Sequence, residues 1–379
     1  MKRITLILFL CSYILTGMPL LSQEKQTLTL EESLKLALEQ NPFHLAAGKK
    51  VDSAETQVRQ AAAQFFPSLN AQGTKNLAEK VMELEFPSMI PGEPPQRVEV
   101  DFTRDYQMTL ALNIPVFTGG RLVSGFKQAN YQVKSSQEGL RQSRHNIIFN
   151  TKQAFYGILL AREFIDVAQE AVDVAEKLHK NIEVQYEVGL ASKFDLLRSE
   201  VQVANLKPQL IRAQNNLEVA KLSLKNVLGM DQSKPIEAEG ELMYEPVEPD
   251  LEECLETALE KRPELRQFRL QKKMAGESVN MAMASGLPSV SISGQYNYWA
   301  DQFNFKSDTW QNFYSLNLLV NIPIFNGLAT HAEVAQAKTA LKELEFNQKG
   351  LVDQIRLEVR QAVLNLEEAR QTLMSQEKN

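Results

Sequence analysis

Two segments of the chain alternate apolar and polar side chains along their whole length, as a strand with one apolar and one polar face does. In the first segment the apolar face consists of Tyr106, Met108, Leu110, Leu112, Ile114 and Val116. In the second it consists of Tyr314, Leu316, Leu318, Val320, Ile322 and Ile324. A shorter strand of similar pattern precedes each of them, near 69–77 and 289–298. The sequence therefore predicts four strands in two pairs, at 68–117 and 289–325.

Long helices are predicted after each strand pair, as a hairpin over 121–228 and a single helix over 328–379. A helix that continued from Gly120 to the next turn without a proline would reach about 100 Å at 1.5 Å per residue. Gly189 suits a left-handed cap at that turn, and Ser192 can cap the return helix. Pro208 predicts a kink or break in the return helix. Apolar residues at the spacing of a coiled-coil seam occur in the first helix of the hairpin: Leu160, Phe164, Val167, Ala171, Val174 and Leu178.

An internal repeat divides the chain into 23–249 and 250–379. The segment TLEESLKLALEQNP that begins at Thr29 recurs as DLEECLETALEKRP at Asp250, a shift of 221 residues. The segment NIPVFTGG at Asn113 recurs as NIPIFNGL at Asn321, a shift of 208 residues, so the first repeat holds 13 additional residues between these landmarks. We interpret this excess as a longer exposed loop because it contains Pro87, Pro91, Pro94 and Pro95.

The alternating strands fit either a soluble sheet or a membrane sheet. An antiparallel sheet on a soluble core shows the same alternation and is commoner. Strands of about ten residues match the length that crosses a bilayer at a tilt, and aromatic residues gather near their ends as in an interfacial girdle: Tyr296, Tyr298, Trp299, Trp310, Phe313 and Tyr314. Four strands cannot close a barrel and lipid tolerates no open sheet edge, so membrane strands imply a homo-oligomer.

The first 22 residues have the pattern of a secretory signal peptide, with Lys2 and Arg3 before a largely apolar run. We expect cleavage near Gln23; an uncleaved anchor is the alternative, although the run makes a poor membrane helix. After it, no run of 18 consecutive apolar residues occurs, so any membrane span is expected to consist of strands. Cleavage would leave Cys254 as the one cysteine, which excludes an intramolecular disulfide.

The charge and the histidines limit the function. The formal net charge is -6 and becomes -8 without Lys2 and Arg3, which argues against nucleic acid as a partner. The histidines at 44, 145, 179 and 331 are scattered without metal-ligand pairing, and no phosphate-binding glycine loop occurs. The sequence thus predicts no catalytic site, no metal and no cofactor, and we expect a protein that is not an enzyme.

From Leu28 onward the chain resembles the TolC-like outer membrane efflux family. The elements that carry the resemblance are Leu30 to Ser33 with Ala37, Asn41 and Pro42, the NIPVFTGG turn, and the stretches 186–190 and 195–197. No single element is specific, but their order, spacing and duplication are.

The resemblance implies a mainly α-helical fold with membrane strands. Three copies would each give four strands to a shared twelve-stranded barrel in the outer membrane and would project long coiled-coil hairpins into the periplasm. The implied function is passive exit of substrates from a tripartite efflux pump, with a periplasmic adaptor protein and an inner-membrane pump as partners.

The resemblance also implies roles for residues at the turns. Val188, Gly189 and Leu190 match the hairpin tip that docks onto the adaptor, and Asp195 matches an acidic position near the periplasmic aperture. Asp195 is equally well explained as an acid in the first turn of a helix. The strand-to-helix turns are matched by Gly119, Gly120, Asn326 and Gly327.

The chain departs from the family at its end. Gly189 follows Phe117 by 72 residues, so the second tip glycine is expected 72 residues after Phe325, beyond Asn379. The second hairpin is therefore expected to be incomplete, as in a fragment or a truncated gene product.

Two other functions stay open. A periplasmic coiled-coil scaffold or adaptor would use the long helices for partner contacts without crossing the membrane, but such proteins lack amphipathic strand pairs with aromatic ends. An outer-membrane channel of a type I protein secretion system would use the same channel with another pump. The cargo is not predicted by this sequence.

Overall fold

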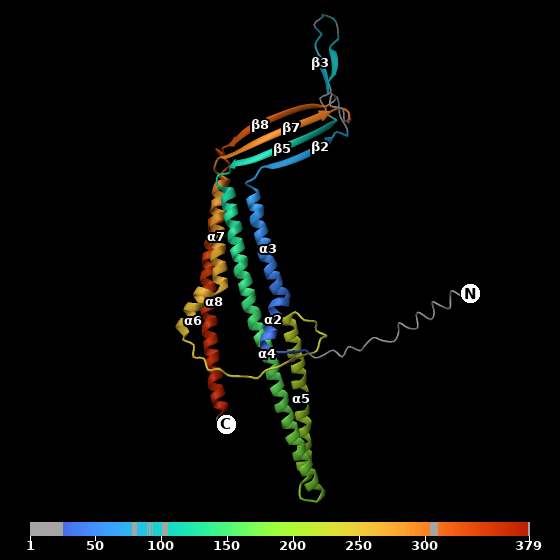
Figure 1. The fold of residues 1–379 in the computed structure, drawn as a ribbon, viewed down its shortest axis with the longest axis vertical. Helices are drawn as coiled ribbons and strands as arrows, with labels where there is room; N and C mark the ends of the chain where they lie inside the picture. Colours follow the sequence, from blue (N-terminus) through green and yellow to red (C-terminus); the bar gives the residue numbers. More distant parts are fainter. Residues whose placement is uncertain are drawn as a thin grey trace, which may run out of the picture. The chain divides into compact units, whose positions relative to one another are not determined.

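The structure is a computed structural model that describes residues 26–77, 82–88, 90, 92, 94–100, 105–303 and 310–377 (Figure 1). The predicted signal peptide and Pro91 lie outside the described residues. The helices are α2 (Leu30–Gln40), α3 (Pro42–Ala63), α4 (Arg121–Glu187), α5 (Lys193–Leu228), α6 (Leu251–Lys261), α7 (Pro263–Ala284) and α8 (Ala329–Gln376). The strands are β1 (Gln26–Leu28), β2 (Ser68–Lys75), β3 (Met82–Phe86), β4 (Gln96–Val100), β5 (Tyr106–Phe117), β6 (Ile236–Ala238), β7 (Ser289–Ala300) and β8 (Gln311–Asn321).

Contacts between the elements divide the chain into two compact units. The first unit comprises the residues up to Lys49 together with Leu140–Pro249, and the second comprises Lys50–Gly139 together with Asp250–Asn379. The units do not follow the sequence repeats, because part of the first repeat joins the unit that contains the second. The fold is mainly helical, as predicted.

The first compact unit has a core where β1 and β6 pair in parallel and helices α2, α4 and α5 meet. Side chains from all five elements contribute to it: Leu28, Ala37, Ile147, Phe155, Ile158, Leu159, Leu224, Leu228, Ile236 and Ala238. Burial of aliphatic and aromatic side chains contributes about 1.5–3 kcal/mol each. This core therefore fixes the base of the α4–α5 hairpin.

Asn41 links the start of α3 to the end of α5. Its Nδ2 donates to the Val227 carbonyl at 2.7 Å, and its Oδ1 accepts from the backbone N–H groups of Phe43 and His44 at 2.9 and 3.1 Å. The side chain is buried, so each of these bonds replaces one to water. Pro42 follows as the first residue of α3, where its missing N–H is not needed.

The second repeat has a different side chain at the equivalent position. Arg262 precedes Pro263 as Asn41 precedes Pro42, and its guanidinium lies 2.5 Å from the Glu358 carboxylate on α8. The hydrogen bond from Arg262 lowers the pKa of Glu358 below its ordinary value. Both repeats thus attach the residue before the helix-starting proline to a long helix, one through an amide and the other through an ion pair.

The second compact unit contains a four-stranded antiparallel sheet of order β2-β5-β7-β8 (Figure 1). Strands β2 and β7 follow helices whereas β5 and β8 precede helices, so all four junctions with helices fall at one end of the sheet. The register agrees, because Ser68 lies opposite Asn113 and Ser289 lies opposite Asn321. We call this the helix end and the opposite side the loop end.

Helices of the second unit contact one another below the helix end. Helix α8 lies beside α7, where Lys272 Nζ is 3.5 Å from the Glu345 carboxylate. The first turns of α4 lie against α7, where the Gln128 amide donates to the Ser278 hydroxyl at 3.0 Å. These contacts set the helices that enter and leave the sheet side by side.

The last strand ends earlier than predicted. Ile322 and Ile324, expected on the apolar face of the last strand, lie after β8, which ends at Asn321. The partner strand β7 begins at Ser289, opposite Asn321, so no backbone remains for them to pair with. Pro323 has no N–H to donate in any case.

Of the kink or break predicted at Pro208, the break does not occur, because α5 is continuous through it. The proline removes one hydrogen bond within the helix. Contacts on both sides keep the helix together: Val203 and Ala213 are buried, and Lys207 Nζ lies 2.9 Å from the Glu176 carboxylate of α4.

The 13 additional residues of the first repeat belong to a segment that forms a hairpin, not only the loop that we predicted. Strands β3 and β4 pair antiparallel along their whole length and place Glu85 opposite Arg97, whose Nε donates to Glu85 at 2.7 Å. The alternation of Leu84 and Phe86 with glutamates is a strand signal that the prolines obscure.

The hydroxyl of Thr151 is buried in the first unit without a hydrogen-bond partner among the described residues. Because an unpaired buried hydroxyl costs about 1–3 kcal/mol, Thr151→Val, which keeps the shape, is expected to stabilise the fold by about 1 kcal/mol or more. The midpoint of thermal unfolding measures this change. Thr151→Ser is the matched control: it keeps the hydroxyl and loses a methyl group, so it is expected to lower the midpoint. A lower midpoint for the valine variant would contradict the assignment.

Candidate functional site

The four-stranded sheet has one apolar face. The register aligns the alternating apolar residues of neighbouring strands in rows, so that Leu69 lies opposite Leu112, Leu112 opposite Gly294 and Gly294 opposite Leu316. The next row towards the loop end contains Ala71, Leu110, Tyr296 and Tyr314. The apolar positions predicted separately in each strand therefore form one continuous surface.

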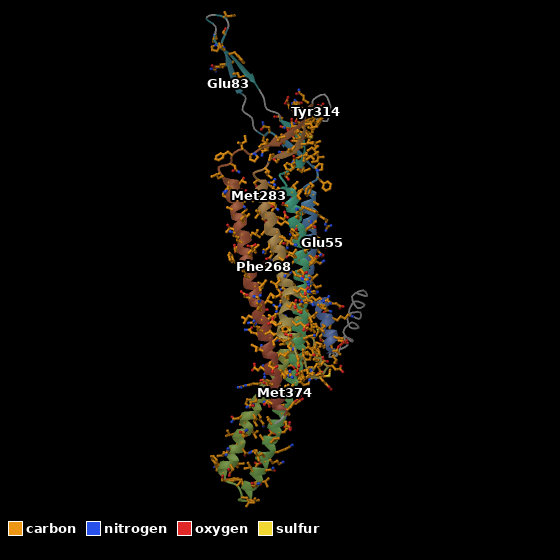
Figure 2. The ribbon with its side chains drawn as sticks, turned by 90° about the vertical axis from the view of Figure 1, so that its left-hand side faces the viewer. Glu55, Glu83, Phe268, Met283, Tyr314 and Met374 are labelled. Atoms are coloured by element: carbon orange, nitrogen blue, oxygen red, sulfur yellow. The ribbon has the colours of Figure 1, made fainter. Side chains whose placement is uncertain are left out.

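This apolar face is uncovered in the single chain. Leu316 is 71% exposed and Leu318 is 67% exposed on the edge strand β8. The register places Tyr314, which is labelled in Figure 2, on the same face. Large continuous apolar surfaces are uncommon on soluble monomers and mark contact with lipid or with another protein. The sheet consequently needs an apolar environment on this side.

Aromatic rings gather at the loop end on the apolar face. Tyr298 stacks on Trp310 with ring centroids 5.0 Å apart, and Phe303 contacts both Trp310 and Tyr106 at 6.1 and 5.4 Å. The sequence pattern did not find Phe303, which lies outside the strands. Tyrosine and tryptophan rings at a strand end are typical of a membrane–water interface.

Two of the six predicted girdle residues lie on the other face of the sheet. Trp299 is opposite Gln107 and Phe313 is opposite Asn297, which places both rings among polar side chains. The prediction was based only on closeness to strand ends. It was wrong for these two residues because successive side chains of a strand point to opposite faces of the sheet.

The opposite face of the sheet is polar. Thr109 lies opposite Gln72 on one side and Asn297 on the other, and its hydroxyl donates to Asn297 Oδ1 at 2.8 Å. Near the helix end, Ser293 lies opposite Asn113 and Asn317. Hydroxyl and amide groups thus predominate on one side of the sheet, with Trp299, Phe313 and Leu319 among them, and aliphatic and aromatic groups predominate on the other.

The strand-to-helix turns use backbone conformations that favour glycine. Gly119 has φ +62° and Gly120 has φ +89°, and in the second repeat Gly327 has φ +65°. The position equivalent to Gly120 is Leu328, which has φ +67° despite its side chain. The sequence prediction did not single out Leu328, because leucine is not a residue type that favours the left-handed conformation. Asn326 supports this turn, since its amide donates to the Thr330 hydroxyl at 2.6 Å.

The tip of the α4–α5 hairpin lies at 188–192. Gly189 has φ +79°, and the N–H groups of Gly189 and Leu190 donate to the carbonyls of Tyr186 and Gln185 at 3.0 and 2.7 Å. This is the bonding of a Schellman motif, which ends a helix at a left-handed glycine. Val188 and Leu190 are exposed, Leu190 by 80%.

Asp195 lies in the first turn of α5 and forms a capping box with Ser192. The Ser192 hydroxyl donates to the Asp195 carboxylate at 2.6 Å, and the Asp195 N–H donates back to that hydroxyl at 3.2 Å. The hydrogen bond from the Ser192 side chain lowers the pKa of Asp195 below its ordinary value. Asp195 therefore has a structural role as a cap, whatever else it contacts.

Two polar contacts join the helices of the hairpin behind the tip. His179 Nδ1 lies 2.8 Å from the Ser199 hydroxyl, and that hydroxyl donates its single hydrogen to the Leu196 carbonyl at 2.7 Å. His179 is therefore the donor, which fixes the proton on Nδ1. The ion pair between Glu176 and Lys207 lies farther from the tip. Sequence reasoning missed both pairs, because partners on antiparallel helices are not at a fixed spacing.

The heptad seam predicted in α4 is not the stripe that packs within the first unit. Its large apolar members are exposed, Val167 by 65%, whereas the buried stripe consists of Thr151, Phe155, Ile158, Val172 and Ala175. A groove of about 580 Å³ separates the seam residues Leu160, Phe164 and Val167 from Arg212 and Asn216 of α5. Heptad spacing predicts that a stripe is apolar but not which neighbour covers it.

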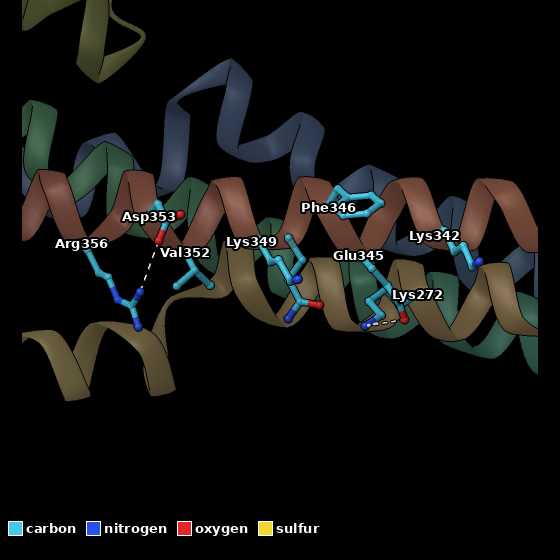
Figure 3. Close-up of a pocket in the computed structure, with 9 residues that line it drawn as sticks. Lys272, Lys342, Glu345, Phe346, Lys349, Val352, Asp353 and Arg356 are labelled. Carbon is cyan, nitrogen blue, oxygen red and sulfur yellow. Dashed lines mark hydrogen bonds and ion pairs between the residues drawn. The ribbon is translucent and has the colours of Figure 1, made fainter.

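A second groove lies beside α8 in the second unit and is lined by charged side chains (Figure 3). Lys272 faces Glu345 across it, and Arg356 lies 3.3 Å from the Asp353 carboxylate. Lys349 lies over the Phe346 ring at 5.7 Å. Exposed ion pairs of this kind contribute at most about 1 kcal/mol each, so the groove is a surface of mixed charge that adds little to stability.

Metal-ligating side chains are dispersed in the described part of the chain. Among its residues, no three His, Cys, Asp or Glu side chains meet as ligands for a metal ion. None of its helices has an apolar stretch long enough to cross a membrane. The features that stand out are therefore the two-faced sheet and the hairpin tip.

The sequence matches the family described as outer membrane efflux protein over residues 33–230 and 254–379. The chain belongs to this family. The match confirms the family resemblance that the order, spacing and duplication of the sequence elements indicated.

Relatives and solved structures agree with the family. The protein CyaE from Bordetella pertussis is 23% identical over 339 residues, which cover 89% of this chain and 68% of CyaE. The outer membrane protein TolC from Escherichia coli K12 is 24% identical over 214 residues, which cover 56% of this chain and 43% of TolC. The structure of the outer-membrane channel OprN shares the fold with a TM-score of 0.74 at 17% identity, over 91% of this chain and 76% of that one. This chain thus spans about two thirds of CyaE and less than half of TolC.

The two turn glycines differ in the space around them, which yields a paired prediction. A Cβ at Gly119 would lie 2.9 Å from Leu287 Cβ and 3.0 Å from the Ala284 carbonyl oxygen, whereas nothing lies within 4 Å of a Cβ at Gly120. Gly120→Ala is expected to cost about 1 kcal/mol from backbone strain, and Gly119→Ala about 2 kcal/mol or more. Unfolding midpoints of the two variants measure the difference. Equal losses would show that the contact with Leu287 is not rigid.

The Asp195 cap predicts that the hairpin tip loosens in acid. Because the folded pKa is below the ordinary value, the stabilisation is complete above the ordinary pKa and is lost as the pH falls through the folded pKa. Hydrogen-exchange protection of the first amides of α5, corrected for intrinsic rates, is expected to fall over this range.

Asp195→Asn is expected to remove that pH dependence, because an amide does not titrate there. Asp166→Asn, on α4 away from the cap, is the matched control and is expected to keep it. Acid loosening that persists in the Asp195 variant would assign it to another group.

Proposed function

We propose that this chain is a subunit of an outer-membrane channel through which substrates leave a tripartite efflux pump passively. The observation that carries the proposal is the sheet whose register places every apolar row on one side and hydroxyl and amide groups on the other. Family membership supports it, because the matched family consists of outer membrane efflux proteins.

The apolar face would contact lipid. Its rows continue across all four strands, and its aromatic cluster lies at the loop end, where an interface between lipid and water would be. In a scaffold or adaptor that stays in the periplasm, such a face would be exposed to water, which is unfavourable. The uncovered apolar rows therefore favour the channel over the scaffold.

The sheet edges imply that several copies assemble. β2 and β8 each have a neighbour on one side only among the described strands, so each presents unpaired N–H and C=O groups. In lipid such groups must be paired, and β8 of one copy pairing with β2 of the next satisfies them. Three copies would form the homotrimer with a shared twelve-stranded barrel that the family resemblance implies.

The hairpin tip would dock onto the periplasmic adaptor. Val188, Gly189 and Leu190 form an exposed turn, and Phe194 at the start of α5 is exposed as well. Asp195 lies beside them, in the position that the resemblance places near the aperture. The helices would project into the periplasm, and the energy for transport would come from the inner-membrane pump.

Membrane fractionation followed by unheated gel electrophoresis tests the channel proposal. The chain is expected in the outer-membrane fraction as a trimer that heating dissociates. Leu316→Lys is expected to prevent this assembly, because a lysine on the lipid side costs about 2–4 kcal/mol per copy at mid-membrane.

Asn317→Lys is the matched control, because it changes the neighbouring residue at the same depth on the polar face and is expected to assemble. A soluble periplasmic monomer from the unchanged chain would favour the scaffold. Equal tolerance of the two lysines would show that the apolar face does not contact lipid.

A further inference from the structure

The four strands of the sheet are almost free of charge. Charged residues make up 23% of the whole chain, yet strands of 8, 12, 12 and 11 residues contain one, Lys75. Lys75 lies opposite Tyr106 at the loop end of the apolar face, and its Nζ is 5.3 Å from the Tyr106 ring centroid. The polar face consequently has no charged residue in any of the four strands.

Neutral hydrogen-bonding groups replace charges on that face. Its polar members are Ser68, Asn70, Gln72, Thr74, Gln107, Thr109, Asn113, Ser289, Ser291, Ser293, Gln295, Asn297, Gln311, Ser315, Asn317 and Asn321. Hydroxyl and amide groups both donate and accept, so they can solvate an anion as well as a cation. The Thr109 hydroxyl donates to Asn297 Oδ1, and the Asn317 amide lies 3.4 Å from the Ser315 hydroxyl.

A membrane location does not by itself require this neutrality. Lipid penalises charge on the face that it touches, whereas side chains facing the lumen are free to carry charge and thereby set the selectivity of a pore. Walls of one charge sign raise the local concentration of counter-ions by about 10- to 1,000-fold. The lack of charged residues on the polar face of the four strands is therefore not explained by contact with lipid, and we attribute it to the pore that this face would line.

We propose that the strand-built section of the pore is a neutral, hydrogen-bonding passage that does not discriminate between anions and cations. The inference rests on the proposed channel function and specifies the solutes that this section admits, small polar molecules of either charge. Any preference for one charge would then arise in the helical part, whose surfaces carry charges such as those along α8.

Cysteine modification in assembled channels measures the local potential directly. Ser293→Cys is nearly isosteric and lies mid-strand on the polar face, in a background that carries Cys11→Ala and Cys254→Ser. The probes are methanethiosulfonates with a sulfonate or a trimethylammonium group, and the readout is the rate at which channel conductance changes in a planar bilayer. The ratio of the two rates is expected within about threefold of the ratio for a small free thiol, because an uncharged wall concentrates neither reagent.

Two variants calibrate the measurement. Asn297→Asp, added to the same background, is expected to favour the cationic reagent by about tenfold, which shows that the assay detects one added acid per copy. Ile292→Cys is the matched control on the apolar face and is expected to react with neither reagent.

The outcomes separate the inference from the function on which it rests. A channel in which the thiol of the Ser293→Cys variant prefers one reagent by more than about tenfold overturns the neutral passage and leaves the channel function intact. Reaction of the Ile292→Cys variant but not of the Ser293→Cys variant, or the absence of any conductance, overturns the channel proposal and the inference together.

Discussion

The pairing register of the four-stranded sheet is the constraint on which the rest of the structure depends. Side chains alternate between faces along a strand, so a slip of one residue in any pair would move an entire apolar set to the polar side. The register is held at the helix end, where Gly119 and Gly120 turn the chain out of β5 and Gly327 and Leu328 turn it after β8. The helices that enter and leave the sheet lie side by side and so place the strands next to one another. The helices and the two-faced sheet therefore depend on each other.

The two repeats show which parts of that arrangement require a particular residue and which require only a contact. Asn41 and Arg262 occupy the same place before a helix-starting proline, yet one donates to a backbone carbonyl of α5 and the other pairs with a carboxylate on α8. The turns after β5 and after β8 each need a residue in the left-handed conformation at the last position, and the second repeat has Leu328 there at the cost of strain. In the first case the attachment to a long helix is kept although its chemistry differs. In the second the left-handed conformation is kept although the residue differs.

Sequence periodicity predicted the four strands of the two-faced sheet and the helical hairpin, because those features follow from the order of apolar and polar residues. It did not predict where β8 ends, since that depends on where its partner β7 begins. Proline content suggested a loop where β3 and β4 pair, and Pro208 suggested a break that buried neighbours prevent. The tip glycine and the Ser192 cap lie where their residue types suggest, whereas the His179–Ser199 contact joins positions that no local pattern connects.

Each compact unit, taken by itself, leaves apolar surface uncovered. In the second unit it is the sheet, whose edge strand β8 exposes Leu316 and Leu318, and in the first it is the heptad seam of α4, with Phe164 and Val167 exposed. A stripe with coiled-coil spacing and a sheet with two unpaired edges are both surfaces that a further helix or strand completes. Folding of one copy therefore buries only part of the apolar surface that these two patterns provide. The remainder depends on contacts that the helices and the sheet make with lipid or with other polypeptide segments, which ties the stability of this chain to its assembly.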